Sequence, residues 1–130
     1  MPEDNKKAEY LVGVDLGGTK ILAGVFDNQL QCLGKSKVST KGDRGPEAVI
    51  KRLARCVQDA VDECDLSMKQ IRGIGVGAPG SSDPENGRVL FAPNLGWEDV
   101  SLKKELEKLI GPPVFLDNDC NLATLGVHEV

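Results

Sequence analysis

The residues best suited to chemistry gather in one turn near the start of the chain: Asp15, Gly17, Gly18, Thr19 and Lys20. This turn joins two apolar runs, rich in β-forming residues, within residues 12–26. Paired glycines let the backbone N–H groups of a turn converge on a phosphate, and a neighbouring carboxylate suits the Mg²⁺ that accompanies it. The pattern therefore predicts phosphate binding at this turn, with the carboxylate available to a metal ion.

The same letters argue against a P-loop. Gly13 and Gly18 have the spacing of that motif, but in a P-loop Lys precedes Ser or Thr and a helix follows. Here Thr19 precedes Lys20, and residues 21–26 are rich in β-forming side chains. We therefore expect a hairpin turn between two strands, which binds the phosphate without a helix N-terminus behind it.

Size and composition point to one globular domain. The chain has 130 residues, of which 40% are hydrophobic and 28% charged, which is enough for a packed core. A net charge of −4 gives no sign of nucleic acid or an anionic membrane as a partner. The charged opening lacks a signal peptide's apolar core, and no apolar run approaches the ~20 residues of a membrane span. The four cysteines fit neither a zinc spacing nor a disulfide framework. We therefore expect a cytoplasmic protein with reduced, mostly buried thiols.

The rest of the chain predicts further strands and three helices, the first two of them amphipathic, in the order β-β-β-α-β-(β)-α-β-α. A change of apolar period at residue 46 marks the first helix. A loop over residues 78–84, rich in Pro and Gly, excludes helix there. Trp97 is expected to anchor its loop by burying its ring. Beyond the first hairpin, the expected strands cover residues 30–40, 71–77, 88–91 and 114–116, and the expected helices cover 46–64, 102–110 and 119–130. Residues 1–9 are expected to form a disordered tail.

Polar or glycine-rich groups follow three of the expected strands, at residues 15–20, 77–81 and 117–119. Ligands in open α/β sheets bind at the carboxyl ends of strands, so we expect the three segments to share one site. Residues 75–80 also match G-x-G-x-x-G, but Pro79 disfavours the helix that a dinucleotide fingerprint needs. Asp117 to Asp119 either cap the next helix or bind a ligand, and spacing alone does not decide between the two.

Four motifs, in the order of the family, resemble the amino-terminal half of the ROK family of sugar kinases (repressors, open reading frames, kinases), in its glucokinase-like branch. They are D-L-G-G-T-K at residues 15–20, G-V-G-A-P-G at 75–80, P-N-L-G-W at 93–97 and N-D-C-N at 118–121. The resemblance implies an α/β, ribonuclease-H-like fold, the actin-like ATPase and sugar kinase fold, with a mixed sheet and flanking helices. Residues 10–130 would form the first lobe of a two-lobed kinase. The second lobe, with a structural zinc, is expected downstream of a chain that looks truncated.

The resemblance also implies a role for each matching residue. Asp15 would hold Mg²⁺, and the ATP phosphate loop would consist of Gly17, Gly18, Thr19 and Lys20. Asp119 would contact the sugar and act as the general base that takes the proton from the attacking hydroxyl. The other sugar contacts would come from Gly80, Ser81, Asn94 and Asn118.

The implied activity is ATP-dependent phosphorylation of a hexose, with glucose and its 6-hydroxyl favoured. One alternative is a sugar-responsive transcriptional regulator of the same family, although the nine residues before Tyr10 are too few for its helix-turn-helix domain. Another is a non-catalytic sugar-binding remnant, which would need neither Asp15 nor Asp119. Hexose and ATP are the expected partners, the full-length protein is expected to form a homodimer, and residues 1–130 alone are expected to lack kinase activity because half of the cleft is missing.

Overall fold

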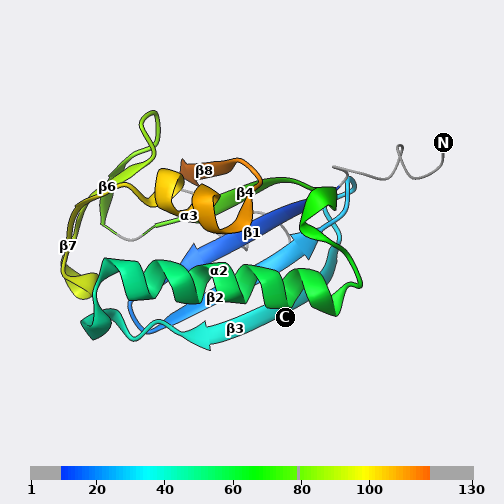
Figure 1. Cartoon of the computed structure of the whole chain (residues 1–130), viewed down its shortest axis with the longest axis horizontal. Coiled ribbons are helices and arrows are strands. Elements are labelled where there is room, and N and C mark those ends of the chain that lie inside the picture. Colours follow the sequence, from blue (N-terminus) through cyan, green and yellow to red (C-terminus); the bar gives the residue numbers. More distant parts are fainter. Residues whose placement is uncertain (1–9, 79, 118–130) are drawn as a thin grey trace.

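Figure 1 shows the computed structural model of the chain, which describes residues 10–78 and 80–117. Its main element is a five-stranded mixed sheet with strand order β3-β2-β1-β4-β8. The strands are β1 (Tyr10–Leu16), β2 (Lys20–Phe26), β3 (Cys32–Ser39), β4 (Ile71–Gly77) and β8 (Val114–Asp117). Two helices, α2 (Pro46–Glu63) and α3 (Leu102–Ile110), pack against it, and short 3-10 turns cover Gly42–Arg44 (η1), Met68–Gln70 (η2) and Pro93–Leu95 (η3).

The pairing of the strands brings three carboxyl ends to one edge of the sheet. β1 is antiparallel to β2, as the predicted hairpin requires, and parallel to β4, which is in turn parallel to β8. Asp15 is in register with Gly77, and Gly77 with Asp117. The three segments that are expected to share one site therefore start from neighbouring positions of the sheet.

Helices α2 and α3 lie on the same face of the sheet (Figure 1), and the core lies between them and the sheet. Val14 and Leu16 of β1 point into this core, whereas Asp15 between them is exposed, because successive side chains of a strand alternate between its faces. Asp15 therefore lies on the face of the sheet opposite the two helices.

Helix α2 follows Gly45, whose φ is 95°, and has Pro46 in its first turn, where a missing N–H costs nothing.

A second, three-stranded sheet lies next to the carboxyl ends of β1 and β4 (Figure 1). It consists of β5 (Ser81–Asp83), β6 (Arg88–Ala92) and β7 (Trp97–Val100). The sequence predicted only the central strand β6, because three or four polar residues such as those of β5 carry no alternation that marks a strand. Trp97 is completely buried in the core, as expected.

The cysteine expectation holds in part within the described residues. Cys56 is buried in the core, and burial raises the pKa of its thiol. Cys32 and Cys64 are only half-buried, and all three are free thiols. Cys120 and the helix expected over residues 119–130 lie outside the described residues, as does the expected tail over residues 1–9.

Candidate functional site

The turn between β1 and β2 is a tight hairpin connection. The Gly17 N–H donates to the carbonyl of Lys20 at 3.0 Å, and this bond closes the turn. Asp15 at the end of β1 and Lys20 at the start of β2 are both exposed, so a carboxylate and an ammonium group stand on either side of the turn. The turn thus presents the groups that a phosphate with its metal ion needs, and it does so without a helix N-terminus.

Thr40, which sequence analysis did not single out, is hydrogen-bonded to the backbone of this turn. Its N–H donates to the carbonyl of Thr19 at 2.9 Å, and its hydroxyl donates to the carbonyl of Gly17 at 2.8 Å. The side chain is 0% exposed and is the one polar side chain counted as buried in the described part of the chain. No sequence signal distinguished Thr40, because it directly follows a strand and threonine is a common residue in and beside strands.

Asn94 lies against the phosphate turn, 76 positions along the chain from Gly18. A Cβ placed on Gly18 would lie 3.3 Å from the Cβ of Asn94 and 3.9 Å from its side-chain amide nitrogen. Asn94 is exposed on η3, which ends at Gly96 with a φ of 68°. The structure therefore places one expected sugar-binding residue close beside the expected phosphate loop.

Gly80 connects β4 to the small sheet in a conformation that only glycine adopts easily. Its φ is 75°, and a Cβ there would collide with the carbonyl oxygen of Phe91 and lie 3.0 Å from the Cα of Ala92. Ser81, the next residue, is exposed and pairs with Phe91 at the start of β5. The two expected sugar-binding residues are thus held where β4 passes into the small sheet.

We expect Gly80→Ala to destabilise the protein by at least about 2 kcal/mol, because the new methyl group must displace the backbone of β6 and the residue must stay at positive φ. Thermal unfolding of the variant measures this loss. The matched control is Gly96→Ala: Gly96 also has positive φ, in the left-handed helical region, but nothing lies within 4 Å of its Cβ position. Equal losses in the two variants would contradict a steric role for Gly80.

The expected metal site contains a single identified carboxylate, that of Asp15. Within residues 10–78 and 80–117, no group of three His, Cys, Asp or Glu side chains is placed to hold a metal ion. This donor set suits Mg²⁺, which is commonly held by one or two carboxylates together with water and substrate phosphates. The chemistry of the site therefore fits a metal ion that arrives with its nucleotide.

Positive charge continues from the turn along the neighbouring strands. A shallow groove of about 400 Å³ is lined by Lys20, Lys35 and Lys37, together with Leu22 and Ser36. Leu22 is paired with Lys37, so the groove follows the register of β2 and β3 from the phosphate turn. These ammonium groups make the surface beside the turn favourable to an anion although the chain as a whole is acidic.

The remaining expected residues, Asn118 and Asp119, lie outside the described residues, as does Pro79. The backbone of β8 runs to Asp117, which is in register with Gly77 at the edge that also holds Asp15. Their roles therefore stay predictions from sequence.

Lys103 and Glu107 of α3 fasten the start of β8 to that helix. Lys103 Nζ donates to Glu107 Oε2 and to the carbonyl of Val114, both at 2.7 Å, and the Val114 N–H donates to Glu107 Oε2 at 2.8 Å. Two hydrogen bonds hold the pKa of the Glu107 carboxyl below its usual value: the bond from Lys103, which has the larger effect, and the bond from the Val114 N–H. This cluster positions the strand that leads to residues 118 and 119.

Stability should therefore depend on the charge of Glu107. Since its pKa is lower in the folded than in the unfolded state, its contribution is present above the unfolded pKa of about 4.3 and is lost as the pH falls through the folded value. We expect Glu107→Gln to reduce the free energy of unfolding by about 1 kcal/mol near pH 7 and by less near pH 3. Urea titrations of both proteins at the two pH values measure this, and a pH-independent difference would contradict it.

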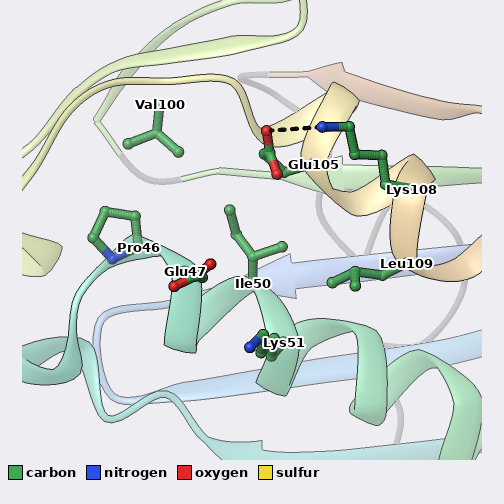
Figure 2. A pocket seen from close by; sticks show the side chains of 8 residues that line it. All are labelled: Pro46, Glu47, Ile50, Lys51, Val100, Glu105, Lys108 and Leu109. Carbon is green, nitrogen blue, oxygen red and sulfur yellow. Dashed lines mark ion pairs between the residues drawn. The ribbon is translucent and has the colours of Figure 1, made fainter.

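A separate hollow of about 320 Å³ lies between α2, α3 and Val100. Figure 2 shows an apolar floor that includes Ile50 and Leu109, and a charged rim on which Glu105 and Lys108 form an ion pair of 3.7 Å. None of the residues predicted to bind phosphate, metal or sugar lines it. The hollow is therefore distinct from the site at the strand ends.

In the described part of the chain, neither helix is long and apolar enough to cross a membrane.

Comparison with known proteins agrees with the resemblance seen in the motifs. The ROK family pattern matches residues 11–130. The chain is 40% identical over 117 residues to the glucokinase of Thermotoga maritima, covering 89% of this chain and 35% of that protein. It is 30% identical over 122 residues to the xylose repressor of Caldicellulosiruptor bescii, covering 94% of this chain and 31% of the repressor.

Among solved structures, the chain resembles a ROK family glucokinase from Streptomyces griseus in complex with glucose and AMPPNP. The TM-score is 0.75 and the identity 36%, and the match covers 88% of this chain and 35% of that one. This chain thus spans about a third of the length of each of these relatives. It belongs to the ROK family and has the actin-like ATPase fold of the ROK sugar kinases.

Proposed function

We propose that the complete protein phosphorylates a hexose with ATP, and that its substrate is glucose at the 6-hydroxyl. The observation that carries this proposal is the close approach of Gly18 in the phosphate turn to Asn94 of the expected sugar segment, at the edge of the sheet where Asp15 also lies. A phosphate donor and a hydroxylated acceptor bound to these two segments would be neighbours. Identity of 37–40% to glucokinases supports the same activity.

The residues divide the work of phosphoryl transfer among them. This reaction depends on positioning and charge neutralisation more than on covalent help from the protein. The turn of Gly17 to Lys20 would hold the transferred phosphate, with the ammonium group beside it balancing charge. Mg²⁺, when bound, would supply charge neutralisation, and Asp15 would hold it. Asp119 would accept the proton of the hydroxyl, which is oriented by contacts to Gly80, Ser81, Asn94 and Asn118.

Similarity to a xylose repressor favours a second candidate, a sugar-responsive transcriptional regulator. Such a protein would use the sugar contacts but would not need a base at Asp119 or a metal ligand at Asp15. Phosphoryl transfer therefore separates the two candidates, whereas sugar binding does not.

The test is a coupled assay of ADP formation by the complete protein, with Mg·ATP and a panel of glucose, mannose, fructose, N-acetylglucosamine and N-acetylmannosamine. We expect turnover that depends on sugar and is fastest with glucose, and NMR of the product should show phosphate on the 6-hydroxyl. Sugar binding without any turnover would contradict a kinase and favour the regulator. Turnover with a different hexose would keep the kinase and correct the substrate.

Residues 1–130 alone should give no measurable sugar-dependent turnover, because they carry only one side of the expected cleft and positioning in a closed site supplies much of the rate. The measurement is the same coupled assay with the purified chain, run beside the complete protein. Robust turnover by the short chain would contradict the two-lobed site.

A further inference from the structure

We propose that Thr40 is a positioning residue for phosphoryl transfer, which holds the turn of Gly17 to Lys20 in the conformation that binds phosphate. The inference rests on the proposed function and adds to it a residue that touches neither substrate. Thr40 reaches the turn from the end of β3, and its two hydrogen bonds engage the carbonyls of Gly17 and Thr19.

The polar groups of the turn show what these bonds achieve. The Gly17 N–H is used by the carbonyl of Lys20, and the carbonyls of Gly17 and Thr19 are both used by Thr40. In the described part of the chain, the N–H groups of Gly18 and Thr19 make no hydrogen bond. Gly18 is half-buried and Thr19 is exposed, so these two N–H groups, which have no partner among the described residues, are available to an anion. A carbonyl released by loss of Thr40 could turn toward the phosphate and repel it.

The burial of Thr40 makes this arrangement rigid. The side chain is 0% exposed, so its hydroxyl cannot exchange the hydrogen bond to Gly17 for one to water unless the surrounding packing opens. Ser39, the preceding residue, is exposed and pairs with Lys20, so the strand also fixes the far end of the turn. Residues 39 and 40 thus engage the turn at Gly17, Thr19 and Lys20.

The same stretch of chain also holds the turn close to residues 93–97, which include the expected sugar contact Asn94. Just after Thr40, the backbone of Gly42 packs so closely on Leu95 that an added Cβ would lie 2.9 Å from its side chain. Leu95 is the neighbour of Asn94, which lies close to Gly18. Thr40 therefore belongs to a closed ring of contacts that fixes the distance between the phosphate turn and the expected sugar contacts.

The test compares Thr40→Val and Thr40→Ser in the complete protein. Valine preserves the shape of the side chain but removes the hydroxyl donor, whereas serine retains the donor. We expect Thr40→Val to raise the KM for ATP and the Kd for AMPPNP by about 10-fold, corresponding to about 1.4 kcal/mol, with the KM for glucose changed much less. Thr40→Ser should return both nucleotide constants to within about 3-fold of wild type.

Calorimetry with AMPPNP provides a readout that does not depend on turnover, and thermal unfolding shows whether each variant is folded at the assay temperature. If wild type phosphorylates glucose and Thr40→Val binds AMPPNP as tightly as wild type does, the inference is wrong and the proposed function stands. Equal loss of nucleotide binding in Thr40→Val and Thr40→Ser would also contradict a role for the hydroxyl. If wild type binds no nucleotide at all, both the inference and the proposed function fail.

Discussion

Asp119→Asn in the complete protein is expected to lower kcat by ~10²–10⁴-fold, the range contributed by a positioned general base, while hexose affinity stays close to that of wild type. Asparagine keeps the size of the side chain and one oxygen that can accept a hydrogen bond from the sugar. It cannot take up the proton that the attacking hydroxyl must lose. The measurement pairs steady-state kinetics with the hexose dissociation constant from calorimetry.

Asp59→Asn is the matched control for this variant, because Asp59 is a half-exposed carboxylate on α2, outside the expected site, with a long ion pair of 4.0 Å to Arg55. It should leave kcat unchanged. Two outcomes would contradict the assignment. Wild-type turnover by Asp119→Asn would remove Asp119 from the base role, and loss of hexose binding at unchanged kcat would make it a binding residue only. A transcriptional regulator would show no turnover in either protein, so this experiment also separates the two candidate functions.

The second large effect is expected from Asp15→Ala, which should lower kcat/KM for Mg·ATP by on the order of 10²-fold and raise the Mg²⁺ concentration needed for half-maximal rate. Asp15 lies at the end of β1, exposed, in register with Gly77 and beside the turn that would hold the phosphates. In the described part of the chain no cluster of acidic or other metal-binding residues could replace it. The variant should fold normally because the side chain is outside the core.

The measurement is a Mg²⁺ titration of the rate at fixed ATP, with Asp62→Ala of α2 as the control for loss of an exposed carboxylate. The control should titrate like wild type. An unchanged Mg²⁺ requirement in Asp15→Ala would show that the metal is held by ATP and other residues, and Asp15 would then need another explanation.

Much of the fold could be predicted because its signals are local. The first helix was expected over residues 46–64 and is observed at Pro46–Glu63, since its apolar residues repeat with a helical period and Pro46 suits the first turn. The hairpin around residues 17–19 followed from glycines between two β-rich runs, and it excluded a P-loop by the order of Thr19 and Lys20. Strands β5 and β7 escaped prediction because they are stable only as partners of β6.

The sequence by itself determined which residue types could bind phosphate, metal and sugar, and it determined the family, because motifs and apolar periods are read from neighbouring positions. Only the tertiary structure decided which of them meet. The close approach of Gly18 to Asn94 and the hydrogen bonds of Thr40 to Gly17 and Thr19 join residues far apart in the chain. Such contacts depend on strand order, register and the packing of short turns. These arise from the sum of many weak interactions across the core, and no single stretch of sequence encodes them.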